Sequence, residues 1–224
     1  MEDVLDLYAA PFDPARPVVC VDESPLALTA PTRDPIPAAP SQVRKADYEY
    51  ERRGSCSLFA AFQPLAGWRT VQVRDRRTAQ DFATFLQALV DDVHFAEAEV
   101  IRLVLDNLNT HTPAALYETF PPAEARRIAR KLEWHYTPAH GSWLNMVEIE
   151  WSVLAQQCLR GQRLPDLDAV AEEVTAWVTT RNQQRATVHW RFTTTDARVV
   201  LDHLSPPIVV PPAPAQHLPV RTAA

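Results

Sequence analysis

Residues 99–113, EVIRLVLDNLNTHTP, join an aliphatic run to a polar segment, with the carboxylate of Asp106 at the junction. The aliphatic run has the length and composition of a buried strand. Residues 78–95, TAQDFATFLQALVDDVHF, have a different period, because their apolar side chains recur with the i, i+3, i+4 spacing of an amphipathic helix. These apolar positions are Phe82, Phe85, Leu86, Leu89, Val90 and Val93. A helix that leads into a buried strand favours an α/β fold.

Working outward from this stretch, the same patterns predict further strands and helices. Three strand-length runs precede the helix and one follows Asp106; they are residues 16–23, 55–64, 68–75 and 132–138. Helical periodicity covers residues 114–120, 123–131, 143–159, 165–184 and 193–204. Strands joined by a hairpin and followed by alternating helices and strands predict a mixed sheet flanked by helices, with extra helices toward the C-terminus.

Proline usage divides the chain into segments. Prolines crowd into the region 24–46, which we interpret as an extended excursion within the domain, and into residues 205–224, which are expected to form a disordered tail. The domain itself is predicted to span residues 17–204, with residues 1–16 as an N-terminal remnant or linker.

Composition excludes several classes of protein. The four glycines cannot form a dinucleotide-binding fingerprint or a phosphate-binding P-loop. The three widely spaced cysteines argue against a disulfide framework or a zinc knuckle and are expected to be small core residues. The acidic N-terminus is unlike a signal peptide and no apolar run is long enough to cross a membrane, so a cytoplasmic protein is expected.

The formal net charge of −6 argues against a surface that binds nucleic acid everywhere, but leaves local basic patches open. One basic cluster, residues 69–77 (RTVQVRDRR), is read on its own as an ordinary solvated surface.

Two aspartates share one context, because Asp22 ends PVVCVD and Asp106 ends VIRLVLD. The ends of neighbouring strands converge on the ligand crevice of open α/β sheets, so these two acids could share a cation. Glu148 and Glu150 both fall near the border of the apolar stripe of the helix that follows, and periodicity does not choose between them. Three such acids suit two-metal phosphoryl transfer. Taken alone, each aspartate is more often a turn residue or a helix cap, and each glutamate is more often a surface residue.

The segments VCVDE, LVLDNLNTH and HYTPAHGSWLNMVEIEWSVL resemble the three acidic motifs of DDE endonuclease domains in bacterial insertion-sequence transposases, namely the insertion sequence 630 family of the mariner superfamily. The resemblance implies a ribonuclease H-like fold. It also implies that Asp22, Asp106 and Glu148 are the catalytic, metal-binding acids, with Glu148 preferred because LNMVE matches the family's Leu-Asn-x-x-Glu signature. The residues implied as supporting or DNA-contacting are Asn107, His111, His140, Ser142, Trp143 and Asn145.

The resemblance implies a transposase catalytic domain that cleaves DNA at transposon ends and transfers the strands into target DNA. The implied cofactors are Mg²⁺ or Mn²⁺, as two ions, and the implied partners are terminal inverted repeats, TA-containing target DNA and further copies of the chain. Residues 1–16 are too short for a helix-turn-helix module, so a separate N-terminal half is expected to supply end recognition. Localisation is then cytoplasmic and nucleoid-associated. The alternative is an inert, truncated remnant that acts at most as a binding or dimerisation module.

Overall fold

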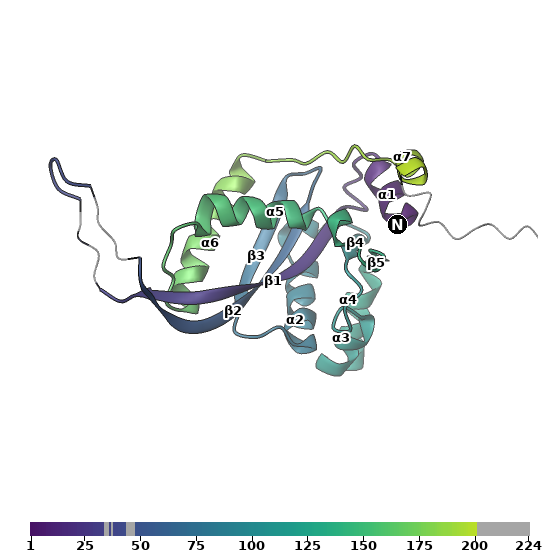
Figure 1. The fold of residues 1–224 in the computed structure, drawn as a ribbon. Helices are drawn as coiled ribbons and strands as arrows, with labels where there is room; N and C mark the ends of the chain where they lie inside the picture. The colour runs from purple at the N-terminus through teal and green to yellow at the C-terminus, as the bar shows by residue number, and fades with distance from the viewer. Residues whose placement is uncertain (34–35, 37, 44–47, 201–224) are drawn as a thin grey trace, which may run out of the picture.

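The computed structural model describes residues 1–33, 36, 38–43 and 48–200. Five strands form one sheet in the order β3-β2-β1-β4-β5. Their bounds are β1 Val18–Pro31, β2 Tyr50–Gln63, β3 Trp68–Arg74, β4 Ile101–Leu105 and β5 Leu132–Tyr136. The pairs β1–β2 and β2–β3 are antiparallel, whereas β1–β4 and β4–β5 are parallel. The prediction of a mixed sheet flanked by helices is therefore confirmed (Figure 1).

Three helices cover one face of the sheet: α2 Ala79–Val90, α3 Pro113–Thr119 and α4 Pro122–Arg130. The predicted stripe of α2 is buried from Phe82 to Val90. Val93 is 87% exposed, contrary to the prediction, because α2 ends at Val90 and a 3₁₀ helix, Val93–Phe95, follows. The helical period does not extend past the end of the helix.

The start of α2 is held by a capping box. The Thr78 side chain accepts a hydrogen bond from the Asp81 backbone N–H, and the Asp81 carboxylate accepts one from the Thr78 backbone N–H. We expect Thr78→Ala to lower the free energy of unfolding by about 1 kcal/mol, as for other N-cap replacements. Urea denaturation would measure this loss. Thr84→Ala, inside the same helix, is the control, and it is expected to be neutral or slightly stabilising because alanine has the higher helix propensity. An equal loss in both variants would contradict the capping role.

The opposite face is covered by helix α5 (Val147–Leu154), the π-helix Ala155–Leu159 that continues it, and helix α6 (Leu167–Gln183) (Figure 1). Helix α7 (Thr194–Val200) lies against α1 (Glu2–Ala9) next to this face. Sequence analysis predicted no helix within residues 1–16. The α1 side chains Val4 and Leu5 are nevertheless buried, so this segment contributes to the core.

Strand β1 is longer than its sequence pattern predicted. Residues 24–31, the first part of the expected excursion, continue the strand and pair with β2 from Tyr50 to Leu58, so that the two strands extend together away from the rest of the sheet (Figure 1). The prolines of this segment favoured an irregular excursion. No local pattern indicates the strand, because its partner β2 is distant in the sequence. The predicted tail, 205–224, lies outside the described residues.

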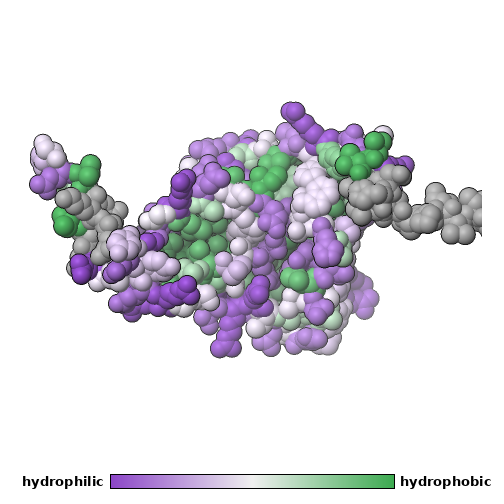
Figure 2. Space-filling model, viewed as in Figure 1, coloured by the Kyte–Doolittle hydropathy of each residue, from purple (hydrophilic) through white to green (hydrophobic). Residues whose placement is uncertain are grey.

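The remaining composition-based expectations concern the cysteines and the surface. All three cysteines are free and buried, as expected. Within the described part of the chain, no helix is long and apolar enough to cross a membrane. Figure 2 shows that one face of the molecule is covered mainly by hydrophilic residues, with smaller hydrophobic patches between them.

Candidate functional site

Strand register brings two of the predicted acids to the same edge of the sheet. In the parallel pair β1–β4 the last paired residues are Cys20 and Val104. Asp22 and Asp106 each lie two residues beyond that pair. Side chains alternate along a strand, so Asp22 lies on the same face of β1 as Cys20, which is the face that α5 covers. Asp106 is the first residue after β4, and it stands at the neighbouring strand end, in contact with His111.

The third acid, Glu148, stands in the first turn of α5 and is exposed. Asn145 holds the start of this helix against β1. Its buried side chain donates a hydrogen bond of 2.9 Å to the Val21 carbonyl oxygen, next to Asp22, and its Oδ1 accepts one of 3.3 Å from the Val147 backbone N–H. Asn145 thus connects the helix that carries Glu148 to the strand that carries Asp22.

We expect Asn145→Ala to lower the free energy of unfolding by about 1–3 kcal/mol, because it leaves the buried Val21 carbonyl and Val147 N–H without their side-chain partner. Chemical denaturation would measure the loss. Asn107→Ala is the control, since the exposed Asn107 is expected to contribute less than about 0.5 kcal/mol. Similar losses in the two variants would contradict the role given to Asn145.

Burial and neighbouring negative charge both act on Asp22. Burial raises the pKa of Asp22 to about 7, and the neighbouring negative charges of Asp106 and Glu148 add to the rise. Each carboxylate makes ionisation of the others less favourable. The site therefore concentrates negative charge that a bound cation would relieve.

His111 is fully buried between two carboxylates. Its Nδ1 lies 2.5 Å from Asp106 Oδ1, and its Nε2 lies 3.2 Å from Glu23 Oε1. Burial by itself lowers the pKa of His111, but the hydrogen bonds and charges of Asp106 and Glu23 outweigh it and raise this pKa to about 9. The ring also stacks on Phe82 of α2, with 4.4 Å between centroids. His111 therefore fixes the orientation of Asp106 and is itself fixed from two sides.

The other four predicted supporting residues lie at the surface of the protein. Asn107, His140 and Ser142 are exposed, and His140 has a positive φ of 62°. Trp143 is 47% exposed and stacks on Trp190, with 6.2 Å between ring centroids. Asn107 follows β4, and His140, Ser142 and Trp143 lie between β5 and α5; none of the four has a described interaction with Asp22, Asp106 or Glu148.

Sequence reasoning missed Glu23 and misplaced Glu150. Glu23 directly follows Asp22, so strand alternation turns it to the opposite face, where His111 lies. Glu150 was expected near the border of the apolar stripe, but its side chain is only 4% exposed and contacts Arg69 and Arg181. Arg69 likewise belongs to the basic cluster read as solvated, yet its side chain is 2% exposed. The signals available in the sequence were Glu23 next to Asp22 and the basic cluster that contains Arg69. Neither signal identifies the partner of the charged residue, because that pairing depends on tertiary structure.

The donor set is compatible with a hard divalent cation. Asp22, Asp106 and Glu148 offer carboxylate oxygens, which Mg²⁺ and Mn²⁺ prefer. Within the described ranges, no group of three or more His, Cys, Asp and Glu side chains is arranged closely enough to hold a metal ion. Mg²⁺ does not require such a cage, because one or two carboxylates commonly bind it together with water and substrate phosphate. The charge concentrated around Asp22 therefore fits a cation that these acids share with a substrate.

Comparisons with known proteins identify the family and the fold. A family model described as DDE superfamily endonuclease matches residues 17–171. No curated protein sequence matches the chain. Two solved structures share its fold at 15% identity with a TM-score of 0.52, namely the Mos1 mariner paired-end complex with Mn and a pre-cleavage Mos1 transpososome. Each alignment covers 82% of this chain but only 56% and 58% of the respective Mos1 chains, so this chain spans less than three fifths of their length. The fold is thus ribonuclease H-like, as predicted.

Proposed function

This chain belongs to the DDE superfamily of endonucleases, and we propose that it is the catalytic domain of a transposase of the insertion sequence 630 type, which cleaves DNA phosphodiester bonds. In this proposal Asp22, Asp106 and Glu148 are the metal-binding catalytic acids. The observation that carries it is geometric: Asp22 and Asp106 each lie two residues beyond the last pair of the parallel strands β1 and β4, and Asn145 bonds the start of the helix that carries Glu148 to the Val21 carbonyl next to Asp22.

The residues of the chain have distinct tasks in the proposed reaction. Asp22 from β1, Asp106 from the end of β4 and Glu148 from α5 would hold the divalent metal. When bound, two Mg²⁺ or Mn²⁺ ions supply activation of the attacking water or hydroxyl and stabilisation of the leaving 3′ oxygen. His111 orients Asp106 through its 2.5 Å contact, and Asn145 holds α5 against β1.

The proposed substrate is DNA, first at the terminal inverted repeats of a transposon and then at TA-containing target sites. The likeness to a paired-end complex and a transpososome supports this choice and also supports assembly of several copies on DNA. We infer that a helix-turn-helix module, on the same or a separate chain, recognises the transposon ends. In a bacterial cell the protein would act in the cytoplasm, at the nucleoid.

Nicking of supercoiled plasmid DNA by the purified protein tests this function. We expect nicking in Mn²⁺, its loss after metal removal with EDTA, and its recovery when Mn²⁺ is restored. If no nicking occurs, the assay is repeated with a helix-turn-helix partner and inverted-repeat DNA. Continued inactivity under those conditions would favour an inert remnant and would overturn the proposal.

A further inference from the structure

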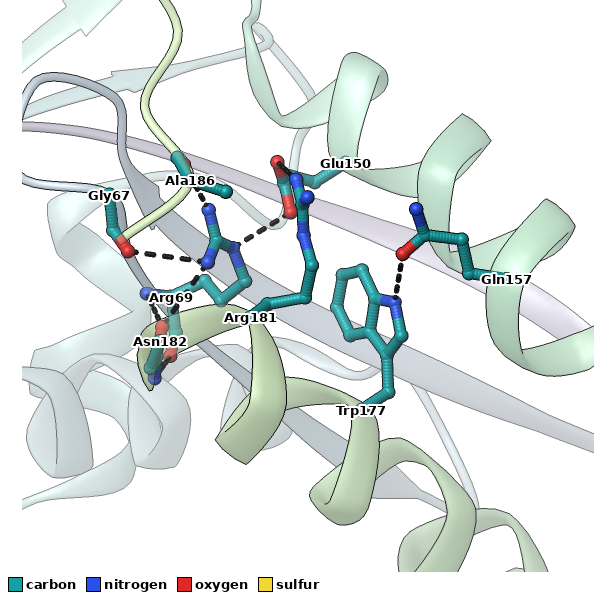
Figure 3. Close-up of polar contacts among 8 residues, drawn as sticks. All are labelled: Gly67, Arg69, Glu150, Gln157, Trp177, Arg181, Asn182 and Ala186. Carbon is teal, nitrogen blue, oxygen red and sulfur yellow. Dashed lines mark hydrogen bonds and ion pairs between the residues drawn. The ribbon is translucent and has the colours of Figure 1, made fainter. Parts of the chain in front are cut away.

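A buried cluster of charges lies on α5 close to the proposed catalytic glutamate. Glu150 Oε2 lies 2.8 Å from Arg69 Nε, and Glu150 Oε1 accepts a hydrogen bond of 3.0 Å from Arg181. Side-chain exposures are 4% for Glu150, 2% for Arg69 and 16% for Arg181. Figure 3 shows both guanidinium groups directed toward the carboxylate, Arg69 from β3 and Arg181 from α6. The cluster therefore joins α5 to two other elements.

Further hydrogen bonds restrict the movement of Arg69. Arg69 donates to the carbonyl oxygens of Gly67 and Ala186, at 3.2 and 2.6 Å. Asn182 of α6 binds the Arg69 backbone twice, accepting from its N–H at 2.9 Å and donating to its carbonyl at 2.8 Å (Figure 3). Arg69 is thus held by β3 and by the end of α6. Glu150 connects α5 to this rigid group.

Energetics suggest that the cluster determines geometry rather than adding stability. Two arginines and one glutamate leave an excess positive charge in a buried site, and desolvation of buried ions commonly offsets their mutual attraction. An apolar contact of similar volume would pack α5 on the sheet at least as well. The hydrogen bond from Arg181 and the ion pair with Arg69, in contrast, restrict the orientation of Glu150.

The orientation of Glu150 also determines the orientation of Glu148, because both residues belong to α5. At 100° per residue, Glu148 and Glu150 project about 200° apart around the helix. Inward anchoring of Glu150 therefore sets the direction in which Glu148 projects. Asn145 fixes the same helix from its N-terminal side by its bond to the Val21 carbonyl. Glu148 thus stands between two polar anchors, three residues after one and two residues before the other.

We propose that Glu150, clamped by Arg69 and Arg181, is a positioning residue that sets the rotation of α5 and thereby places Glu148 relative to Asp22 and Asp106. This inference rests on the proposed function, since it assumes that Glu148 binds metal. The cluster itself does not touch the metal or the DNA. Its loss is expected to weaken metal binding even in a protein that remains folded.

The test measures Mn²⁺ affinity directly, from the electron paramagnetic resonance signal of free Mn²⁺, for wild type and Glu150→Gln. Glutamine keeps the shape but removes the charge that both guanidinium groups contact. We expect Mn²⁺ affinity to fall by about 10–100-fold, the usual effect of losing a residue that orients metal ligands. Nicking should recover partly at saturating Mn²⁺. Leu89→Ala, on the buried side of α2, is the control for general destabilisation. This variant is expected to bind Mn²⁺ with unchanged affinity at temperatures where the protein is folded.

Every outcome of this experiment either supports or overturns the positioning role of Glu150. Unchanged Mn²⁺ affinity in folded Glu150→Gln, or an equal loss in Leu89→Ala, would overturn the positioning role. If Glu150→Gln does not fold, Arg181→Met replaces it, because it leaves the neutral pair of Arg69 and Glu150; several-fold weaker Mn²⁺ binding supports the proposal and unchanged binding overturns it. Failure of the proposed function is recognised separately, since wild type and Asp106→Asn would then bind Mn²⁺ equally.

Discussion

Asp106→Asn is expected to abolish metal-dependent nicking while leaving the fold intact. Loss of a residue that merely orients a metal ligand costs about 10–100-fold, so loss of a ligand's charge should reduce the nicking rate by more than about 100-fold. Asparagine preserves the shape of the side chain and keeps an oxygen that can accept a hydrogen bond from His111, which lies 2.5 Å away. The measurement is the initial rate of plasmid nicking in Mn²⁺, with circular dichroism as the check on folding.

Asp75→Asn provides a matched control for this experiment. Asp75 also follows a strand directly, but its side chain is 71% exposed at the end of β3. Its replacement is expected to leave nicking unchanged. Preparing wild type and both variants identically reveals any contaminating nuclease, because a contaminant would nick equally in all three. Nicking by Asp106→Asn at the wild-type rate would exclude Asp106 from the active site.

The sequence predicts the elements of the sheet well because their signals are local. The aliphatic run before Asp106 and the stripe from Phe82 to Val90 each identify an element without reference to the rest of the chain. The ends of elements are harder to predict. The helical pattern still includes Val93 after α2 has ended, and β1 continues through Pro31 because β2 pairs with it there.

The proposed acids could be predicted from motifs, but the residues that hold them could not. Asp22 and Asp106 are recognisable because each follows a run of aliphatic residues. Glu23 and His111 are separated by many residues, and only the parallel arrangement of β1 and β4 brings them together. Arg69 has the sequence context of a solvated basic cluster, and no periodicity reveals that Glu150 and α6 will bury it. Long-range charge pairing leaves no local pattern.

Arg69→Met is therefore expected to be among the most destabilising single replacements on this side of the sheet. Methionine retains an unbranched apolar stem but leaves the carbonyl oxygens of Gly67 and Ala186 without the guanidinium donor and removes one partner of buried Glu150. Removing one partner of a buried ion pair costs about 3–5 kcal/mol. This is a large part of the roughly 5–15 kcal/mol that stabilises a typical domain. Urea denaturation of wild type and variant would measure the loss.

Arg127→Met is the matched control, because Arg127 also pairs with two carboxylates but is far more accessible. From the surface of α4 it contacts Glu124 of the same helix and Asp91 at the end of α2, and its side chain is 45% exposed. Exposed ion pairs contribute at most about 1 kcal/mol, so this variant should remain close to wild type in stability. Comparable losses for Arg127→Met and Arg69→Met would mean that burial is not what makes the Arg69 contacts important. A loss confined to Arg69→Met would establish that the packing of β3, α5 and α6 depends on the buried charge cluster. Such a dependence is required if the cluster fixes the rotation of α5.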